Sequence, residues 1–454
     1  MGSEMCIRDS FTMVTPVLET SPTREMRMRI DAEARQPVSI PAALERPHVF
    51  KALTRGGRLD IDIVERIQEM LLPPPPFEEG KGPTESRAVT IGEVWQAEWT
   101  QGLKRSGQGY KPGLPTSKEI RRKTAELLRR EALSLTSDDL LDDFGALKIG
   151  LRIAPSKLAP FKTQVIHRMT DVDICESPLV LIKEGFGESA DNIRARLYIG
   201  TAPLAFRRNF YGFSCAGHPH GKRLAKLIFS IVNSELFGYY TLMTSAKFGL
   251  ERRTLLIEDI EDFPILRTLS DAQWKEVEEI ADALKVADPE SWKRMNRCIN
   301  RLYGLTRSDE QVMSDTLATM MPYKAAQTRA RAPAKKAEIE AFRAKVESTA
   351  QPLFSPDGQQ VVVSMLKMPM NGWVAFELKV GATASAKETD LVTEIASQLA
   401  DQEGLSRVIQ PVAPGVLRVA ICNQYRYLTL SRARLCAIDV MREYGHLFPM
   451  PGTE

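Results

Sequence analysis

A run of four prolines, Pro73 to Pro76, interrupts the sequence and limits how the chain can fold. Proline has no backbone N–H and a fixed φ, so four in a row cannot continue a helix or a central strand and form an extended spacer. We therefore expect a domain boundary at this run. A chain of 454 residues also exceeds what one hydrophobic core usually holds, which predicts two to three domains.

The composition is that of a globular protein, with 43% hydrophobic and 26% charged residues. No run of about 18 apolar residues occurs, so we expect no membrane partner and a cytoplasmic location. The cysteines are scattered without a Cys-x-x-Cys pair, which predicts free thiols in a reducing compartment. They are Cys6, Cys175, Cys215, Cys298, Cys422 and Cys436.

Hydrophobic periodicity predicts a mixture of helices and strands. We expect helices over residues 60–70, 118–133, 222–241, 388–399 and 431–443, and another beginning near residue 270. We expect strands over residues 178–182, 197–199, 359–366, 372–380, 415–422 and 425–430. The basic segment 327–336 is interpreted as a solvated linker or arm.

These elements predict a multidomain, mixed α/β (α+β) fold. A domain with small sheets and helices is followed by a helical segment and a small C-terminal α/β domain. The expected divisions are 1–10, 11–86 (a junction or linker remnant), 87–268 (small sheets with helices), 269–350 (helical, with the basic linker) and 351–454. Residues 1–10, MGSEMCIRDS, resemble a translated sequencing adapter and are left out of the fold; an adapter there implies that an upstream domain was lost.

Positive charge is concentrated locally, although the whole chain carries only +3. Between Trp99 and Arg130 there are nine basic residues and two acidic ones. Between Pro203 and Lys226 there are five basic residues and no acidic one. Local fields of this kind attract a phosphate backbone even when the net charge is small.

The segment 230–265, SIVNSELFGYYTLMTSAKFGLERRTLLIEDIEDFPI, carries the most specific motif. It resembles a block in the target-recognition region of adenine-specific DNA methyltransferases of restriction–modification systems. The matching residues are Val232-Asn233-Ser234, Tyr239-Tyr240, Thr244-Ser245, Gly249, Glu251-Arg252 and Phe263-Pro264-Ile265. A weaker likeness continues through residues 299–305. Within the block, the apolar spacing indicates that Asn233, Tyr239 and Phe263 are structural.

The resemblance implies that residues 87–268 are a DNA target-recognition domain and that the chain reads double-stranded DNA for an enzyme that uses S-adenosylmethionine. Such an enzyme also needs a glycine-rich cofactor turn and an Asn/Asp/Ser-Pro-Pro-aromatic loop that holds a flipped adenine. Leu72 to Phe77 has prolines before an aromatic ring but no polar residue in front of them, and Glu184-Gly185-Phe186-Gly187 lacks a third glycine and is interpreted as a hairpin turn. We therefore expect no catalytic residue and no cofactor in this chain, and a missing N-terminal methyltransferase domain.

The segment from Ala205 to Phe213 interleaves aromatic rings with cations, and Arg207 and Arg208 are the first candidates for phosphate contacts. The glycine-rich segment 107–113 resembles a recognition-region loop of the same family, in which Tyr110 would meet a base and Lys111 a phosphate; an ordinary surface turn is the alternative. The complete set of predicted DNA-binding residues is Arg207, Arg208, Lys222, Arg223, Lys104, Arg105, Tyr110, Lys111 and Arg252.

The arginines have other interpretations. Arg207 and Arg208 are also compatible with a partly buried strand that carries solvated guanidinium groups. Arg252 could pair with the nearby acidic residues of the segment 258–262.

Two further patterns suggest metal chemistry. Cys215, His218 and His220 lie close in sequence, but zinc needs a fourth ligand, so we predict no metal there. Pro356-Asp357 followed by Glu377-Leu378-Lys379 has the order of a Pro-Asp…Glu-x-Lys nuclease site, in which two carboxylates hold Mg²⁺. We favour a β-hairpin for this region, and keep a Mg²⁺-dependent nuclease and a protein-interaction scaffold as alternatives to DNA recognition.

Overall fold

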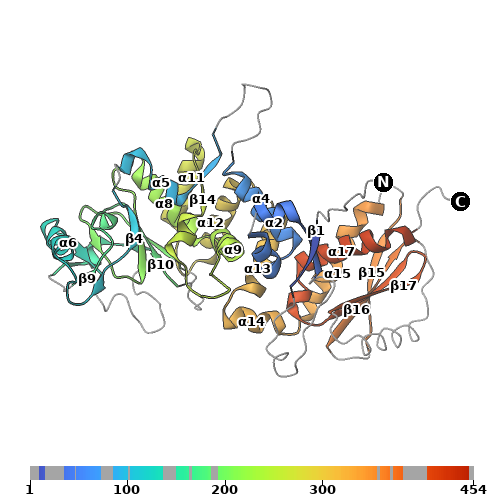
Figure 1. Ribbon diagram of the computed structural model, residues 1–454. Coiled ribbons are helices and arrows are strands. Elements are labelled where there is room, and N and C mark those ends of the chain that lie inside the picture. Colours follow the sequence, from blue (N-terminus) through green and yellow to red (C-terminus); the bar gives the residue numbers. More distant parts are fainter. Residues whose placement is uncertain are drawn as a thin grey trace, which may run out of the picture. The chain divides into compact units, whose positions relative to one another are not determined.

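The computed structural model describes residues 10–15, 35–45, 48–72, 85–100, 103–135, 150–162, 166–185, 193–354, 358–368, 372–381 and 406–448. Several small sheets and many helices confirm the multidomain α+β prediction (Figure 1). The chain divides into two compact units: unit 1 comprises residues 1–61 and 314–454, and unit 2 comprises residues 62–313. The predicted ranges 87–268 and 351–454 each fall within one unit, whereas 11–86 and 269–350 are each divided. The proline run lies outside the described residues.

Unit 2 is built on a five-stranded sheet with the order β4-β13-β10-β11-β7. Its strands are β4 (Ser106–Gln108), β13 (Phe210–Ser214), β10 (Leu179–Lys183), β11 (Ala195–Tyr198) and β7 (Arg152–Ile153). Neighbours are antiparallel except for β11 and β7, which run parallel. The strands predicted at 178–182 and 197–199 are confirmed as β10 and β11. Phe186 and Gly187 of the predicted hairpin turn lie outside the described residues.

Two consecutive helices, α8 (Gly221–Asn233) and α9 (Glu235–Thr244), occupy the range predicted as one helix. Ser234 makes the break because its hydroxyl accepts a hydrogen bond from Phe237 N (3.3 Å) and so caps α9. Helix α8 packs against β10 and β11. Helices α11 (Asp271–Ala283) and α12 (Pro289–Leu302) pack against α8 in turn. The helix expected near residue 270 begins with a capping box between Ser270 and Gln273.

Smaller elements complete unit 2. A three-stranded sheet contains β12 (Leu204–Ala205), β6 (Leu133–Ser134) and β8 (Ala159–Pro160). Two-stranded pairs are formed by β5 (Lys111–Pro112) with β9 (Ile166–Arg168), and by β14 (Pro264–Leu266) with β3 (Ala88–Thr90). Its other helices are α5 (Ile91–Val94), α6 (Lys118–Arg129), α10 (Ile257–Glu261), and the 3-10 turns η2 (Glu98–Thr100), η3 (Pro155–Lys157) and η4 (Asp173–Cys175).

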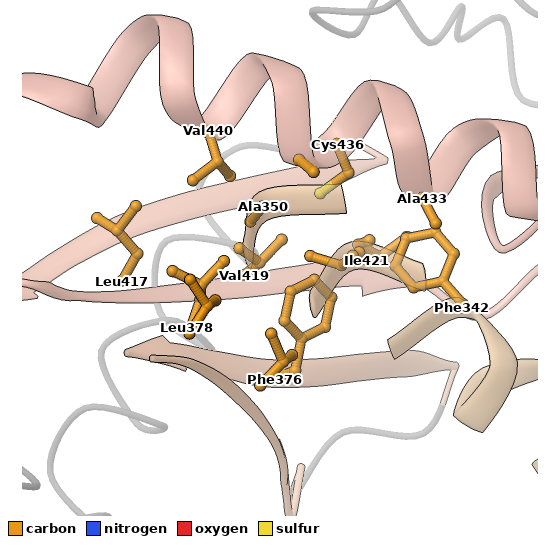
Figure 2. Close-up of a cluster of buried hydrophobic side chains, with 14 of the residues drawn as sticks. Phe342, Ala350, Phe376, Leu378, Leu417, Val419, Ile421, Ala433, Cys436 and Val440 are labelled. Atoms are coloured by element: carbon orange, nitrogen blue, oxygen red, sulfur yellow. The ribbon is translucent and has the colours of Figure 1, made fainter. Parts of the chain in front are cut away.

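Unit 1 contains a four-stranded antiparallel sheet with the order β15-β16-β18-β17. The strands are β15 (Val361–Leu366), β16 (Trp373–Val380), β18 (Val416–Cys422) and β17 (Arg407–Ala413). Helices α15 (Lys336–Phe354) and α17 (Leu430–Tyr444) pack side chains such as Phe342 and Val440 against Phe376 and Val419 (Figure 2). The strand pair predicted over 359–366 and 372–380 is confirmed; the helix predicted over 388–399 lies outside the described residues.

The rest of unit 1 includes β1 (Ser10–Val14) paired with β2 (Arg35–Ser39), α2 (Ile40–Glu45), α3 (His48–Arg55), α14 (Lys324–Arg331), and the 3-10 turns η6 (Tyr425–Tyr427) and η7 (Gly445–Leu447). The boundary between the units falls inside α4 (Arg58–Glu69) and α13 (Arg307–Met320). Throughout the described part of the chain, every helix is too short or too polar to cross a membrane.

Two predictions for unit 1 were wrong. Residues 425–430 form no strand, because Thr429 caps α17 by accepting a hydrogen bond from Arg432 N (3.3 Å). Much of the segment 327–336 is helix α14 instead of a solvated linker. Arg329 in this helix lies 3.6 Å from the centre of the Tyr425 ring and also pairs with Glu338, so its charge is used inside the unit.

Candidate nucleic-acid interface

Several basic residues of unit 2 form ion pairs with acidic residues of the same unit. Arg105 is 8% exposed and pairs with Glu176 at 2.5 Å. Arg130 contacts the same carboxylate at 2.7 Å and also pairs with Asp173 (3.1 Å) and Glu126 (2.7 Å). This network joins the end of α6 to η4. Arg105 therefore cannot serve as the predicted phosphate contact, because its guanidinium is buried against an acid.

Tyr110 is fully buried, and its ring packs edge-on against Phe161 at a centroid distance of 6.1 Å. Burial raises the pKa of its hydroxyl, although a hydrogen bond with Arg207 opposes the shift. The predicted stacking of Tyr110 on a base is therefore wrong, and Arg207 forms a hydrogen bond with this buried side chain. Gly109 makes this packing possible, since a Cβ there would lie 2.4 Å from the carbonyl oxygen of Phe206.

Three adjacent segments each present one cation next to this core. Arg208 N donates to the carbonyl of Tyr110 (3.0 Å), which places Arg208 beside the start of β5. Lys111, the first residue of β5, is paired in register with Arg168 of β9. Arg208 and Arg168 are exposed and Lys111 is half-buried. Like charges opposite each other on paired strands are unfavourable unless an anion lies between them, so this pairing favours an anionic ligand.

Helix α6 adds three more cations. Its acidic residues are used within the helix: Glu119 pairs with Lys123 (2.9 Å), and Glu126 pairs with Arg129 (2.6 Å) and Arg130. Hydrogen bonds from these two arginines lower the pKa of Glu126 to about 2, so it stays ionised. Lys118, Arg121 and Arg122 are left exposed on the first turns.

We define the basic cluster as Lys111, Lys118, Arg121, Arg122, Arg168 and Arg208. Helix α6 packs on β9, and the two lie together at the left of unit 2 in Figure 1. None of the six side chains forms an ion pair with an acidic side chain in the described ranges. Basic side chains gathered in this way produce a local positive field, although the net charge of the chain is small.

The remaining predicted contacts lie elsewhere in unit 2. Lys104 is exposed before β4, at the end of that strand opposite to Lys111, and Lys222 is exposed in the first turn of α8. Arg223 pairs with Glu278 of α11 at 3.3 Å. Arg252 is exposed in a turn whose backbone bonds to Lys247 and Gly249, and it forms no pair with the acidic segment 258–262 among the described residues. The structure thus brings only Lys111 and Arg208 of the predicted set into the basic cluster.

The helices and the Phe263 region of the motif block 230–265 are largely buried. Asn233, Tyr239 and Phe263 are 3%, 0% and 0% exposed, which confirms the prediction that they are structural. The rings of Phe237, Tyr240 and Tyr303 surround Phe263 at centroid distances of 5.2–6.0 Å. These residues belong to a buried core, whereas the turn that carries Arg252 is exposed.

The side chains that suggested a zinc site are buried or contact neighbouring residues. Cys215 is a buried free thiol, and burial raises its pKa. His218 packs edge-on against Trp99 (4.8 Å) and accepts a hydrogen bond from His220 N (3.0 Å). Within the described ranges, no three histidine, cysteine, aspartate or glutamate side chains are grouped so that they could hold a metal ion.

Glu377 of the predicted nuclease pattern is 2% exposed. It pairs with Arg418 and with Lys379, both at 2.9 Å. Burial alone would raise its pKa, but the hydrogen bonds from Lys379 and Arg418 lower it below the ordinary value. Both carboxylate oxygens therefore have cationic partners where a Mg²⁺ site would need open ligands. Pro356 and Asp357 lie outside the described residues.

Comparison with known proteins adds no assignment. No protein-family model matches the chain, and no curated protein matches it in a sequence comparison.

Sequence reasoning missed part of the basic cluster. The charge run between Trp99 and Arg130 contained Lys118, Arg121 and Arg122, but its composition alone did not separate these from the paired Lys123, Arg129 and Arg130. The i,i+4 spacing of Glu119 to Lys123 and of Glu126 to Arg130 was a partial signal, but Arg122 also stands four residues before Glu126, so spacing alone could not tell the paired residues from the others. Arg168 is isolated in the sequence, and only the pairing of β5 with β9 brings it to the cluster.

Proposed function

We propose that this chain binds double-stranded DNA through the basic cluster of unit 2. The observation that carries the proposal is the segregation of charge on α6: both acidic residues of the helix form ion pairs, whereas Lys118, Arg121 and Arg122 have no ion-pair partner in the part of the chain that the structure describes. Together with Lys111, Arg168 and Arg208 they offer six cations for phosphate contacts.

The position of the α6 cations favours a ligand over a purely structural role. Lys118 is the first residue of α6, after the N-cap Ser117. The helix macrodipole makes this end positive, so cations in the first turns destabilise the helix. A bound phosphate would offset that cost, because it interacts with the side chains and with the positive helix end.

We further propose that the chain is the target-recognition part of an S-adenosylmethionine-dependent, adenine-specific DNA methyltransferase of a restriction–modification or phage-defence system. The likeness of residues 230–265 to the recognition region of such enzymes supports this assignment. In this proposal S-adenosylmethionine and the catalytic loop belong to a methyltransferase domain that this chain does not contain. The full chain alone is then expected to bind DNA without transferring a methyl group.

The alternatives have weaker support. A Mg²⁺-dependent nuclease would require Glu377 to leave its two cationic partners. A protein-interaction scaffold without DNA affinity would leave the unpaired charges of α6 unexplained.

The test is fluorescence-anisotropy titration of a labelled mixed-sequence duplex with the full chain. The triple variant Lys118→Ala/Arg121→Ala/Arg122→Ala should bind about 10- to 100-fold more weakly at low salt, because three phosphate contacts are lost. The control Lys275→Ala/Lys293→Ala/Arg301→Ala removes the same charge from ion-paired positions of α11 and α12 and should leave the affinity within about twofold. Equal affinities for the two triple variants would contradict the proposal.

Arg208→Ala is a sharper single test than a change at Arg207. Arg208 is exposed, whereas Arg207 bonds the buried Tyr110, so its loss would disturb the core as well. We expect Arg208→Ala to weaken duplex binding about three- to tenfold without a change in melting temperature.

A further inference from the structure

Leu114 is the most exposed of the large hydrophobic residues in the described part of the chain, at 81%. It lies in the loop that joins β5 to α6. Isolated exposed leucines are common and usually need no explanation. Two features of this loop distinguish Leu114: hydrogen bonds hold its backbone, and residues of the basic cluster flank it in the chain.

The backbone around Leu114 is held by β9. The Leu114 carbonyl lies 3.0 Å from His167 Nδ1, and the Thr116 hydroxyl donates to the carbonyl of His167 (2.8 Å). Pro112 and Pro115 restrict the loop further. Gly113 has φ +141° and passes so close that a Cβ there would meet His167 Cβ at 3.1 Å. Leu114 is therefore presented on a constrained turn.

Cations flank Leu114 on each side. Lys111 precedes it by three residues, and Lys118 follows it by four at the start of α6. Arg168 comes directly after His167, the residue that holds the loop. Duplex DNA has apolar base faces in its interior and anionic phosphates along its two strands. An apolar side chain flanked by cations fits this arrangement, because the apolar side chain would contact the base faces while the cations contact the phosphates.

We propose that Leu114 acts as a wedge that inserts between two base pairs of bound duplex DNA, unstacks that step and bends the helix. This inference rests on the proposed DNA binding of the basic cluster. Insertion of an apolar side chain is a known way for proteins to kink a duplex, and a constrained loop pays less ordering entropy on insertion than a flexible one. An anionic membrane is the less favoured occupant because the outer stripe of α6 presents Lys118, Arg122 and Ala125, which offer no broad apolar face.

The test uses the full chain and a series of duplexes that carry 2-aminopurine at successive positions, whose fluorescence rises when the base is unstacked. The wild-type chain at saturation should raise the fluorescence at one or more positions about twofold. Leu114→Ala should bind within about threefold of the wild-type affinity, because the phosphate contacts remain, and should abolish the rise. Leu114→Phe should retain the rise. Leu128→Ala removes a leucine that is 38% exposed on α6 and should behave as the wild type.

The outcomes separate the wedge from the binding proposal. If the wild-type chain saturates on DNA without a rise, or if Leu114→Ala keeps the rise, the wedge is wrong and DNA binding stands. If the wild-type chain does not bind the duplex at all, the proposed function fails and the wedge fails with it. A third outcome would show that the loop contacts lipid: the wild-type chain sediments with phosphatidylserine vesicles, the Leu114→Ala variant does not, and no duplex gives a rise in 2-aminopurine fluorescence. This outcome would overturn the DNA wedge.

Discussion

The side chain of Asn233 joins helix α8 to strand β11. Its Oδ1 accepts hydrogen bonds from the backbone N–H groups of Arg194 (2.9 Å) and Ala195 (3.0 Å). Its Nδ2 donates to the carbonyls of Ala195 (3.0 Å) and Phe229 (3.1 Å). All four hydrogen-bonding positions of the amide are therefore used, and the side chain is almost completely buried.

Asn233→Ala should lower the free energy of unfolding by about 3 kcal/mol, because it leaves buried backbone groups without partners. Asn296 gives a matched control. It is half-buried and accepts one hydrogen bond, from Glu235 N (3.0 Å), so Asn296→Ala should cost about 1 kcal/mol. Urea unfolding followed by circular dichroism measures both. Equal losses for the two variants would show that the Asn233 network contributes little.

Glu377 provides a pH-dependent prediction. Its pKa is lower in the folded chain than its ordinary value of 4.5, because Lys379 and Arg418 stabilise the carboxylate despite its burial. The carboxylate therefore stabilises the fold above pH 4.5, and this contribution is lost as the pH falls through the folded-state pKa.

Glu377→Gln should destabilise the chain by about 3 kcal/mol at pH 7, because Arg418 stays buried without its charged partner. The difference from the wild-type chain should shrink as the pH falls below 4.5. Urea titrations across this pH range measure it, with Glu340→Gln at an exposed ion pair as a control that should change little. A deficit that grows towards low pH would contradict this account of Glu377.

Residue roles could be predicted from the sequence where apolar periodicity determined them. Asn233, Tyr239 and Phe263 were correctly interpreted as structural from the spacing of their apolar neighbours. Arg105 and Tyr110 were interpreted wrongly because a basic or aromatic residue does not reveal its partner. Glu176 lies 71 residues from Arg105, and only the fold brings the two together.

At the level of elements, α6 shows a conflict between helix stability and binding. Its first residue is Lys118, and Arg121 and Arg122 follow within the next turn. These cations interact unfavourably with the positive end of the helix. The conflict predicts that one substitution will change stability and DNA affinity in opposite directions.

Lys118→Glu should raise the free energy of unfolding by about 0.5 kcal/mol, because an acidic residue suits the first turn and stands four residues before Arg122. The same change should weaken duplex binding at least about tenfold, because it removes one phosphate contact and neutralises another. Lys275→Glu on α11 makes the same change in net charge and should leave the affinity nearly unchanged. A Lys118→Glu variant that is stabilised and keeps full affinity would place the DNA contact elsewhere.

Element boundaries could be predicted from the sequence where period and caps agreed, as for α11 and β16. The boundaries could not be predicted where a local hydrogen bond starts or ends an element against the apolar periodicity. Ser234 divides one apolar helix pattern into α8 and α9, and Thr429 starts α17 inside an apparent strand. Strand β17 was missed because Pro411 interrupts its pattern; the structure accommodates this proline at the sheet edge, next to an irregularity in the register.

For the whole molecule, net charge conceals how the charges are distributed. The chain carries only +3, yet pairing inside unit 2 leaves the six cations of the basic cluster together. The sequence predicted a basic region and the fold class, but it could not show which cations are neutralised. That distinction depends on hydrogen bonds and ion pairs between segments such as α6 and η4.

The central claim is that these six cations contact DNA phosphates, and the salt dependence of duplex binding tests it most directly. Each phosphate contact contributes about −0.9 to the slope of log Kobs against log salt concentration, so the full chain should give a slope of about −5. The Lys118→Ala/Arg121→Ala/Arg122→Ala variant should reduce this slope to about −3. A slope that is the same for both proteins, or binding that does not depend on salt, would contradict the claim.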